Sequence, residues 1–443
     1  MCPKVKSLLL LKLTHDTSMF IAYTYVRASE HQDLIFLCNV KWAVWTMSVV
    51  KELQFQELPT GEQLVTPFGI FRVRNGIAIG RCCEVYDGED CVTGEAVALK
   101  VFRRYQQYRG ALQRELFFLH TLNASGAPIV KHIGELEWEG RDVLVQELLS
   151  LTVRDILLCQ EGGACSPWFV ITLTTHILKG LKHLHDNGVV HADLKPPNIL
   201  WDARTATFKL VDFGVSFTTS EQFLHAVQSK GYQAPECVKW NRRVSDPIGT
   251  TLQVKRPGPP ADIWSAGCII VESLTGIRLF SDSLKFEDVD GRLKSALSTV
   301  CKSYPLTFLK ETYNFITRCL QIIPEERANA WDLLCDPWLM YHCRPSYSDL
   351  MILPTAVLRI LNVTDASSSD CADVEKSLLN LCKKYGDVTG YHLELVTGNF
   401  YVRYETASLA EIALQQMTEM VFSDRTLIVT FYPLISWENE EFY

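Results

Sequence analysis

A lysine and a glutamate early in the chain have the surroundings of an internal ion pair. Lys100 interrupts the apolar strand pattern of residues 96–102, and a lysine is costly to bury without an anionic partner. Glu115 lies on the apolar side of a helical stretch at residues 111–119. We therefore expect Lys100 and Glu115 to pair, which would point the lysine toward a phosphate group.

A second group of polar side chains lies between two apolar runs within residues 188–200. The group is His191, Asp193, Lys195 and Asn198. Further motifs follow in the order Lys209-Leu210-Val211-Asp212-Phe213-Gly214, Gly231-Tyr232-Gln233-Ala234-Pro235-Glu236, Asp262-Ile263-Trp264-Ser265-Ala266-Gly267 and Pro324-Glu325-Glu326-Arg327. One such match is common by chance, but an ordered series is not.

This ordered series resembles the protein-kinase family over residues 57–342. The resemblance implies a bilobal protein-kinase fold, ATP as phosphoryl donor, Mg²⁺ as cofactor and proteins as substrates. Lys195, two residues after Asp193, is the pattern of the serine/threonine class, and Ser229 matches the hydroxyl residue that braces Asp193 in that class. Tyrosine specificity fits less well.

The resemblance also implies a role for each matching residue. Asp193 would accept the proton of the substrate hydroxyl, and Lys195 would offset the charge that develops on the transferred phosphate. Asn198 and Asp212 would be the magnesium ligands, because hard oxygen donors suit a hard cation.

Two further matches imply structural roles. Glu236 would pair with Arg327, and Asp262 would anchor the loop that contains Asp193.

The loop expected over the ATP phosphates departs from the family pattern. Counted back from Val85, the three glycine positions fall on Ala78, Gly80 and Cys83, so only the middle glycine remains. Side chains at these positions restrict how closely the backbone approaches phosphate. We expect ATP to be bound by Ala78, Gly80, Val85, Lys100 and Glu115. The departure leaves an alternative open, a weakly active or inactive kinase-fold scaffold that acts through protein binding.

A second departure lies directly before the expected catalytic aspartate. Ala192 replaces the arginine that in most kinases binds a phosphate on the activation loop. We therefore expect activity that does not depend on phosphorylation of that loop.

The last part of the chain has a different pattern. Strands near residues 357–363, 388–396, 400–404 and 426–431 alternate with helices near 371–384 and 408–417. This βαββαβ order predicts a ferredoxin-like domain of the RRM type at residues 355–434, within an overall α+β chain. Residues 435–443 would form an acidic C-terminal tail, and residues 1–56 an N-terminal extension of unknown role.

The charge distribution argues against direct RNA binding by this domain. The chain has a net charge of −8, and residues 345–443 contain 6 basic and 14 acidic side chains, so residues 1–344 are formally neutral. RRMs stack bases on aromatic side chains, but two of the expected positions are Arg359 and Asn399, and only Tyr401 remains. We expect Tyr404 to face the core.

The combination resembles the stathmin-interacting kinase (KIS) family, which joins a kinase to a UHM-type RRM. The matching segments are His191-Ala192-Asp193, Leu353-Pro354-Thr355 and Phe431-Tyr432-Pro433. The resemblance implies that the UHM binds tryptophan-containing basic peptides of splicing factors, that substrates are often Ser-Pro sites, and that the protein is located in the nucleus and also in the cytoplasm.

The expected peptide-binding residues of the UHM are Asp370, Asp373 and Phe422. Phe422 would cover the tryptophan of the peptide, but Met420 replaces the arginine of the family's Arg-x-Phe loop and cannot form its salt bridge. Acidic residues at a helix N-terminus also have an ordinary capping role, so this alternative stays open for Asp370 and Asp373.

The cysteine pattern indicates a reducing compartment, and the length of the apolar runs indicates no membrane span. The 15 cysteines are scattered without a CxxC motif, which is typical of reduced, buried thiols. The apolar run at Leu8–Leu11 is broken by Lys12, well short of the roughly 18 residues that a span requires. We therefore expect protein partners and no membrane.

Overall fold

The computed structural model describes residues 21–27, 34–40, 60–66, 69–80, 82–104, 106–122, 126–245, 254–280, 286, 288–361, 363–364 and 371–443. The chain divides into two compact units, Met1–Phe55 and Gln56–Tyr443. In the first unit, strands β1 (Ile21–Arg27) and β2 (Leu34–Val40) pair antiparallel. Everything below concerns the second unit.

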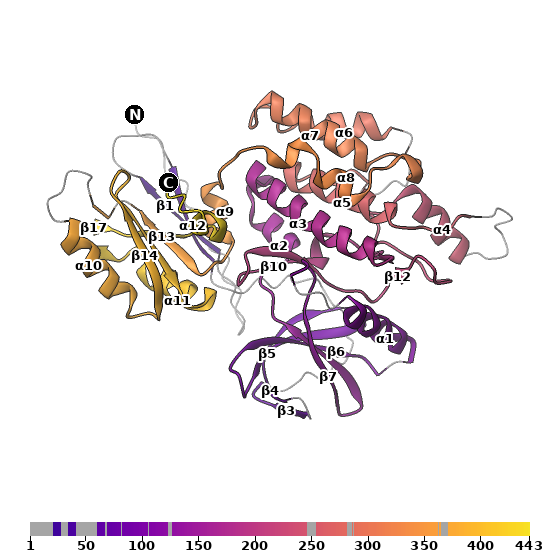
Figure 1. Cartoon of the computed structure of the whole chain (residues 1–443), viewed down its shortest axis with the longest axis horizontal. Coiled ribbons are helices and arrows are strands. Elements are labelled where there is room, and N and C mark those ends of the chain that lie inside the picture. The colour runs from indigo at the N-terminus through magenta and orange to yellow at the C-terminus, as the bar shows by residue number, and fades with distance from the viewer. Residues whose placement is uncertain are drawn as a thin grey trace. The chain divides into compact units, whose positions relative to one another are not determined.

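The second unit begins with a six-stranded antiparallel sheet in the order β3-β4-β5-β6-β8-β7. Its strands are β3 (Gln63–Thr66), β4 (Gly69–Ile79), β5 (Cys83–Asp90), β6 (Ala96–Phe102), β7 (His132–Trp138) and β8 (Arg141–Glu147). Helix α1 (Gln106–Thr121) lies beside strands β6 and β7 (Figure 1). Alternating residues of the strands, among them Val97, Leu99 and Val101, are buried in one cluster, which explains the period of two in their sequence.

A helical lobe follows. Its helices are α2 (Val153–Cys159), α3 (Pro167–Asp186), α4 (Pro235–Ser245), α5 (Pro260–Thr275), α6 (Val289–Ser298), α7 (Leu306–Cys319) and α8 (Ala330–Leu334). Helix α5 is buried on all sides, as its nearly continuous apolar sequence requires. The polar segment that contains His191, Asp193, Lys195 and Asn198 lies between two short strand pairs. These are β9 (Val189–Val190) with β12 (Phe217–Thr218) and β10 (Ile199–Asp202) with β11 (Thr207–Leu210).

The C-terminal part has the expected βαββαβ order. Its elements are β13 (Val357–Leu361), α10 (Cys371–Cys382), β14 (Val388–Glu394), β15 (Asn399–Tyr404), α11 (Ala407–Met417) and β18 (Ile428–Phe431), with a small hairpin of β16 (Val421–Phe422) and β17 (Arg425–Thr426) before β18. The sheet order is β14-β15-β13-β18. Helices α10 and α11 pack on one face around Leu358, Phe400 and Met417. Tyr404 lies in this core, as predicted, and its hydroxyl donates to the Cys382 carbonyl at 3.0 Å.

The other face of this sheet is covered by the end of the chain. Residues 435–443, which we assign from sequence to an acidic tail, include most of helix α12 (Leu434–Glu438) and return onto the strands. The Tyr401 hydroxyl donates to the Tyr443 carbonyl at 2.7 Å, and Arg359 donates to the same oxygen at 3.0 Å. The rings of His392 and Phe442 stack with centroids 4.0 Å apart. Apolar and aromatic side chains within residues 435–443 explain why this segment packs against the sheet and is not a tail in solvent.

A short helix, α9 (Tyr347–Ile352), connects the helical lobe to β13. Ser346 caps this helix by accepting the Asp349 N–H, and the buried Asp349 carboxylate accepts hydrogen bonds from Ser346 and, at 2.5 Å, from Ser166. The indole of Trp201 donates to the Pro354 carbonyl at 2.7 Å. These bonds hold the connecting segment against the helical lobe. None of the helices in the described ranges is long and apolar enough to cross a membrane.

Candidate active site

Lys100 forms the predicted buried ion pair with Glu115. Its Nζ lies 2.9 and 2.7 Å from the two Glu115 carboxylate oxygens and 3.0 Å from Oδ1 of Asp212. Burial opposes the positive charge, but the Asp212 and Glu115 carboxylates outweigh it and raise the pKa of Lys100 well above its usual value. The Lys100 ammonium in turn lowers the pKa of Asp212. Lys100 and Asp212 are therefore held in their charged forms at neutral pH, whereas burial raises the pKa of Glu115.

The sheet explains the position of Lys100. It lies in β6, opposite Val85 of β5 and Leu144 of β8, so its stem is enclosed by strands on both sides. Glu115 is on the face of α1 that turns toward the sheet and is 1% exposed. Asp212 comes from the other lobe, so the ion-pair cluster joins the sheet to the segment after β11.

The Asp193 carboxylate is held by two side chains. Lys195 donates to its Oδ2 at 2.7 Å, and Ser229 donates to its Oδ1 at 2.7 Å. Lys195 also donates to the Ser229 hydroxyl at 3.0 Å, which closes a triangle. The predicted bracing of Asp193 by Ser229 is confirmed. Asn198 donates from Nδ2 to the Asp193 backbone carbonyl at 2.9 Å, so the backbone of Asp193 is restrained as well as its carboxylate.

Asp262 anchors the loop before Asp193, as predicted. Its two carboxylate oxygens accept hydrogen bonds from the backbone N–H groups of His191 and Ala192, each at 2.9 Å, and one oxygen lies 3.0 Å from His185 Nε2. Asp262 is fully buried in α5. Ala192 has a left-handed backbone with φ of 65°, which costs about 1–3 kcal/mol for a residue with a side chain. The two bonds to Asp262 offset this strain.

The residues expected to bind magnesium have suitable donors. Asn198 uses its amide nitrogen for Asp193, so its carbonyl oxygen is left for a cation, and Asp212 supplies a carboxylate. Mg²⁺ is held in proteins by one or two such oxygens together with substrate phosphates and water. In the described residues, no cluster of three or more His, Cys, Asp or Glu side chains could hold a metal by itself. The donor set therefore fits a cation that arrives with phosphate.

The expected phosphate loop is the turn between β4 and β5. Ala78 pairs with Val85 across the two strands, and Gly80 donates its N–H to the Cys83 carbonyl at 2.8 Å. Arg103 donates to the Gly80 carbonyl at 2.7 Å. The hairpin is thus closed despite the loss of two glycines.

The cysteines in this loop differ in environment. Cys83 is buried, whereas Cys82 is half-exposed. A hydrogen bond from the Cys83 thiol, with a contribution from Lys100, lowers the pKa of Cys82 to about 7. The loop therefore contains a half-exposed thiol with a lowered pKa.

The predicted structural pair of Glu236 and Arg327 is also present. The guanidinium donates to the two carboxylate oxygens at 2.8 and 3.2 Å, and it lies over the Trp264 ring at 5.2 Å. The bidentate geometry and the burial of Arg327 make this a structural contact that joins α4 to the segment before α8.

Two functional contacts were not predicted from the sequence. Arg114 of α1 donates to Glu221, in the segment after Asp212, at 2.8 Å. Gln228 donates its backbone N–H to the Ala192 carbonyl at 2.6 Å and accepts the N–H of Ala234 at 2.8 Å. Arg114 carries no motif signal of its own, and its partner Glu221 is 107 positions away in the sequence.

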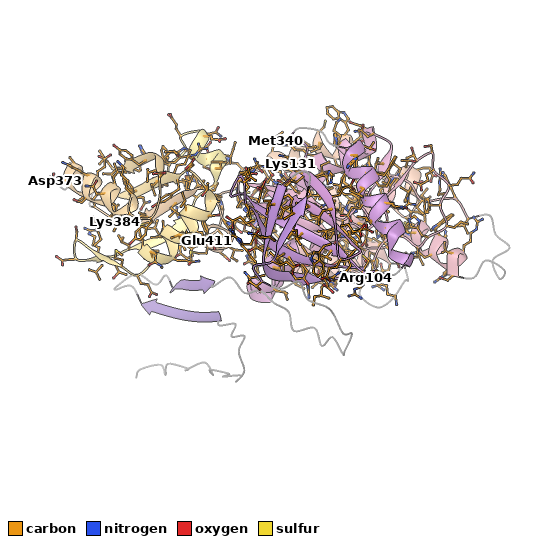
Figure 2. The ribbon with its side chains drawn as sticks, turned by 90° about the horizontal axis from the view of Figure 1, so that it is seen from below. Arg104, Lys131, Met340, Asp373, Lys384 and Glu411 are labelled. Atoms are coloured by element: carbon orange, nitrogen blue, oxygen red, sulfur yellow. The ribbon has the colours of Figure 1, made fainter. Side chains whose placement is uncertain are left out.

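The residues expected to form a UHM peptide site lie around α10 and the β16–β17 hairpin. Asp373 is exposed in the first turn of α10, and Lys384 lies just beyond the other end of this helix (Figure 2). Asp370 lies outside the described residues. Phe422 and Met420 are partly buried against the core of the domain. The structure thus leaves part of the Phe422 ring accessible beside the core.

Comparison with known proteins gives consistent results. Residues 71–339 match the family model described as protein kinase domain. The human protein "Serine/threonine-protein kinase Kist" is 30% identical over 314 residues, which cover 68% of this chain and 73% of that protein. The Arabidopsis thaliana protein "Mitogen-activated protein kinase kinase kinase 3" is 37% identical over 257 residues, covering 57% and 42%. A crystal structure of a kinase domain superposes with a TM-score of 0.51 at 20% identity, covering 64% of this chain and 98% of the other.

Proposed function

Because this chain belongs to the protein kinase family and is a protein serine/threonine kinase, we propose that it transfers the γ-phosphate of ATP to protein hydroxyls through Asp193. The observation that supports this role best is the triangle of Asp193, Lys195 and Ser229, whose three contacts measure 2.7, 2.7 and 3.0 Å. It fixes a carboxylate in the geometry of a general base.

Each residue of the site has a separate role in the proposed phosphoryl transfer. Asp193 orients the substrate hydroxyl and takes its proton, while Lys195 balances the negative charge on the transferred group. Lys100, held by Glu115, binds the α- and β-phosphates of ATP. Asn198 and Asp212 would hold Mg²⁺, which neutralises phosphate charge when bound.

A transfer assay tests this function against the scaffold alternative. The full chain is incubated with γ-labelled ATP and a mixed library of serine- and threonine-containing peptides. We expect incorporation by the wild type, background levels for Asp193→Ala and Lys100→Arg, and wild-type levels for Glu311→Gln, an exposed residue of α7. Equal background signals from wild type and Asp193→Ala would establish the scaffold instead. Replacing proline after serine in the best peptide tests the proposed preference for Ser-Pro sites.

We further propose that the C-terminal domain is a UHM-type RRM that recruits splicing factors and locates the kinase to the nucleus. Support comes from the sheet order β14-β15-β13-β18, the acidic composition and the accessible part of Phe422. The face on which an RRM would stack bases is covered by Phe442 and Tyr443. This cover favours peptide binding over RNA binding.

Titration of the full chain with a tryptophan-containing basic peptide tests the recruitment. We expect saturable binding that is lost in Phe422→Ala and retained in Ile435→Ala, an exposed residue of α12. Absence of binding by the wild type would refute the peptide-binding role and leave the kinase activity unaffected.

A further inference from the structure

Gln146 shares one face of the six-stranded sheet with Lys100. In the register of β6 and β8, Lys100 lies opposite Leu144, two positions before Gln146. Side chains alternate between the two faces of a sheet, so Gln146 and Leu144 point to the same side as Lys100. Val145, between them, belongs to the apolar cluster on the other side. The Gln146 amide is therefore on the side from which Lys100 reaches Glu115 of α1.

The amide of Gln146 is buried, and its nitrogen is unpaired. The residue is 7% exposed, whereas glutamine is mostly exposed in proteins. Its Nε2 has no hydrogen-bond partner among the described residues. A buried donor without a partner destabilises the folded state. An apolar side chain of similar size would avoid this cost, so the amide has a functional reason to be there.

The Glu115 carboxylate is the acceptor on which this amide acts. Burial raises the pKa of Glu115, and Lys100 and the Gln146 amide both oppose that rise. An ionised carboxylate offers about four acceptor positions, and Lys100 occupies one on each oxygen, at 2.9 and 2.7 Å. Positions remain on the carboxylate for an amide N–H. Two strands, β6 and β8, thus direct donors at one buried carboxylate.

The contacts of Lys100 show when a further donor is needed. An ammonium has three N–H donors, and the Nζ of Lys100 lies 2.9 and 2.7 Å from the Glu115 oxygens and 3.0 Å from Asp212. A phosphate oxygen that binds Lys100 must therefore replace one of these acceptors. If it replaces a Glu115 oxygen, the buried carboxylate loses part of its compensation. The Gln146 amide can supply the lost hydrogen bond from the same face of the sheet.

His132 is the alternative partner of Gln146. It lies opposite Gln146 across β7 and β8, its ring centroid is 4.7 Å from that of His120, and its Nε2 is also buried without a partner in the described part of the chain. Burial lowers the pKa of His132, so its ring is mostly neutral at pH 7. A hydrogen bond to a neutral acceptor is weaker than one to a carboxylate. Glu115 is therefore the favoured acceptor.

We propose that Gln146 is a positioning residue of the nucleotide site, whose amide donates to the Glu115 carboxylate when Lys100 binds the phosphates of ATP. The amide keeps Glu115, and with it α1, against the sheet, so that Lys100 stays directed at the phosphates. This role rests on the phosphate-binding function proposed above for Lys100. It predicts that loss of the amide weakens ATP binding without weakening the fold.

Binding of Mg·ATP to the full chain, measured by isothermal titration calorimetry, tests this role. Gln146→Met keeps the side-chain volume and removes the amide, and we expect it to raise the Kd for ATP about tenfold, which is about 1.4 kcal/mol. Gln146→Leu, a second apolar variant of different shape, should show the same loss. Both variants should keep or raise the melting temperature, because they remove a buried unpaired donor. In steady-state kinetics, the KM for ATP should rise and the KM for the peptide should not change.

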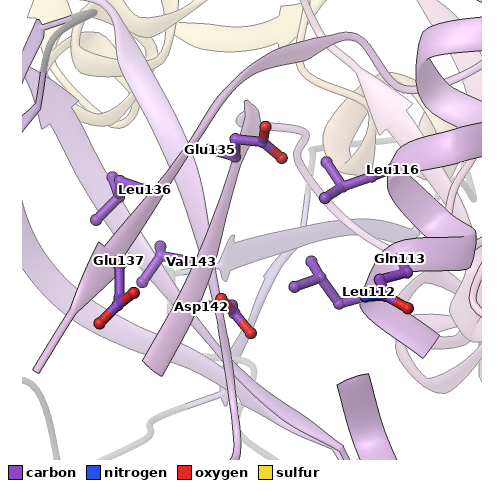
Figure 3. A pocket seen from close by; sticks show the side chains of 8 residues that line it. All are labelled: Leu112, Gln113, Leu116, Glu135, Leu136, Glu137, Asp142 and Val143. Atoms are coloured by element: carbon purple, nitrogen blue, oxygen red, sulfur yellow. The ribbon is translucent and has the colours of Figure 1, made fainter. Parts of the chain in front are cut away.

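A matched control removes an amide from the neighbouring helix. Gln113 is exposed on α1, where it lines a cavity of about 420 Å³ beside the β7–β8 hairpin (Figure 3). Positions 113 and 115 do not share a face of the helix, so Gln113→Met should bind ATP as the wild type does. His132→Leu, which removes the alternative acceptor, should also bind ATP as the wild type does.

A double-variant comparison shows whether Gln146 acts through Glu115. In the background of Glu115→Gln, which lacks the carboxylate, Gln146→Met should change the Kd for ATP by less than about twofold. Equal losses in both backgrounds, unchanged ATP affinity in Gln146→Met, or a similar loss in Gln113→Met or His132→Leu would overturn the proposal. Because binding is measured without phosphoryl transfer, background transfer by the wild type would refute the proposed catalytic function and leave this comparison decisive.

Discussion

Arg114 of α1 is joined to Glu221, in the segment after Asp212, by an ion pair of 2.8 Å. The same guanidinium nitrogen donates to the Ser216 carbonyl at 3.0 Å. Glu221 also accepts the N–H of Thr218 at 3.3 Å, and Arg256 donates to the carbonyl of Glu221. A carboxylate built into the sequence thus holds the segment to α1, as a phosphate does in many kinases. This contact supplies a structural basis for the expectation drawn from Ala192.

We expect Glu221→Gln and Arg114→Ala each to lower kcat/KM by about tenfold, because a hydrogen bond to a charged group contributes about 1.5–3 kcal/mol. Arg114→Lys should recover part of the loss, since it restores the charge. Steady-state kinetics on the full chain measures both. Phosphatase treatment and the variants Thr219→Ala and Ser220→Ala should leave activity unchanged. A large loss after phosphatase treatment would show that a phosphate, and not Glu221, orders the segment.

The buried ion pair of Lys100 and Glu115 should affect stability and activity in different ways. Glu115→Leu leaves the Lys100 ammonium buried with Asp212 as its remaining partner, and we expect a loss of about 3–5 kcal/mol of unfolding free energy. The double variant Lys100→Met/Glu115→Leu removes both charges and should recover most of that stability, but no activity. Denaturant unfolding and the transfer assay provide the two readouts. Recovery of activity in the double variant would exclude a phosphate-binding role for Lys100.

The half-exposed thiol of Cys82 should react faster than other cysteines, and ATP should protect it. The pKa of Cys82 is lowered to about 7, so its thiolate fraction and its alkylation rate rise as the pH increases through 7. Iodoacetamide labelling with peptide mapping measures this rate, with exposed Cys301 as the internal comparison. We expect labelled protein to lose ATP binding and Cys82→Ser to be resistant to inactivation. Labelling of Cys82 that is unchanged by saturating ATP would separate this loop from the nucleotide site.

Contacts between residues with strong local signals could be predicted from the sequence. Lys100 and Glu115 are 15 positions apart, and each is a charged residue in an apolar pattern, so burial without a partner would be costly. Asp193 and Lys195 are two positions apart within one motif. The βαββαβ order followed from the period of the apolar residues in the same way.

Long-range contacts between residues outside the family motifs could not be predicted. Arg114 and Glu221 are 107 positions apart and lie in patterns typical of solvated surface residues. Tyr401 and Tyr443 are 42 positions apart, and the acidic residues of the last segment indicated a tail in solvent. The pairing of Glu137 with Asp142 depends on the register of β7 and β8. No local pattern specifies that pairing.

Removal of the last residues tests what prevents RNA binding by the C-terminal domain: its negative charge, or the C-terminal residues that cover the sheet. Truncation after Asn439 deletes Phe442 and Tyr443 and exposes Tyr401, which is fully buried in the intact chain. We expect the domain to lose about 1–3 kcal/mol of stability from the aromatic contacts, whereas Ile435→Ala should have little effect because Ile435 is 60% exposed. A gel shift with single-stranded RNA should remain negative for the truncated protein, because its acidic surface still repels phosphate. Submicromolar RNA binding that appears on truncation and disappears with Tyr401→Ala would show that the C-terminal residues cover a functional RNA site.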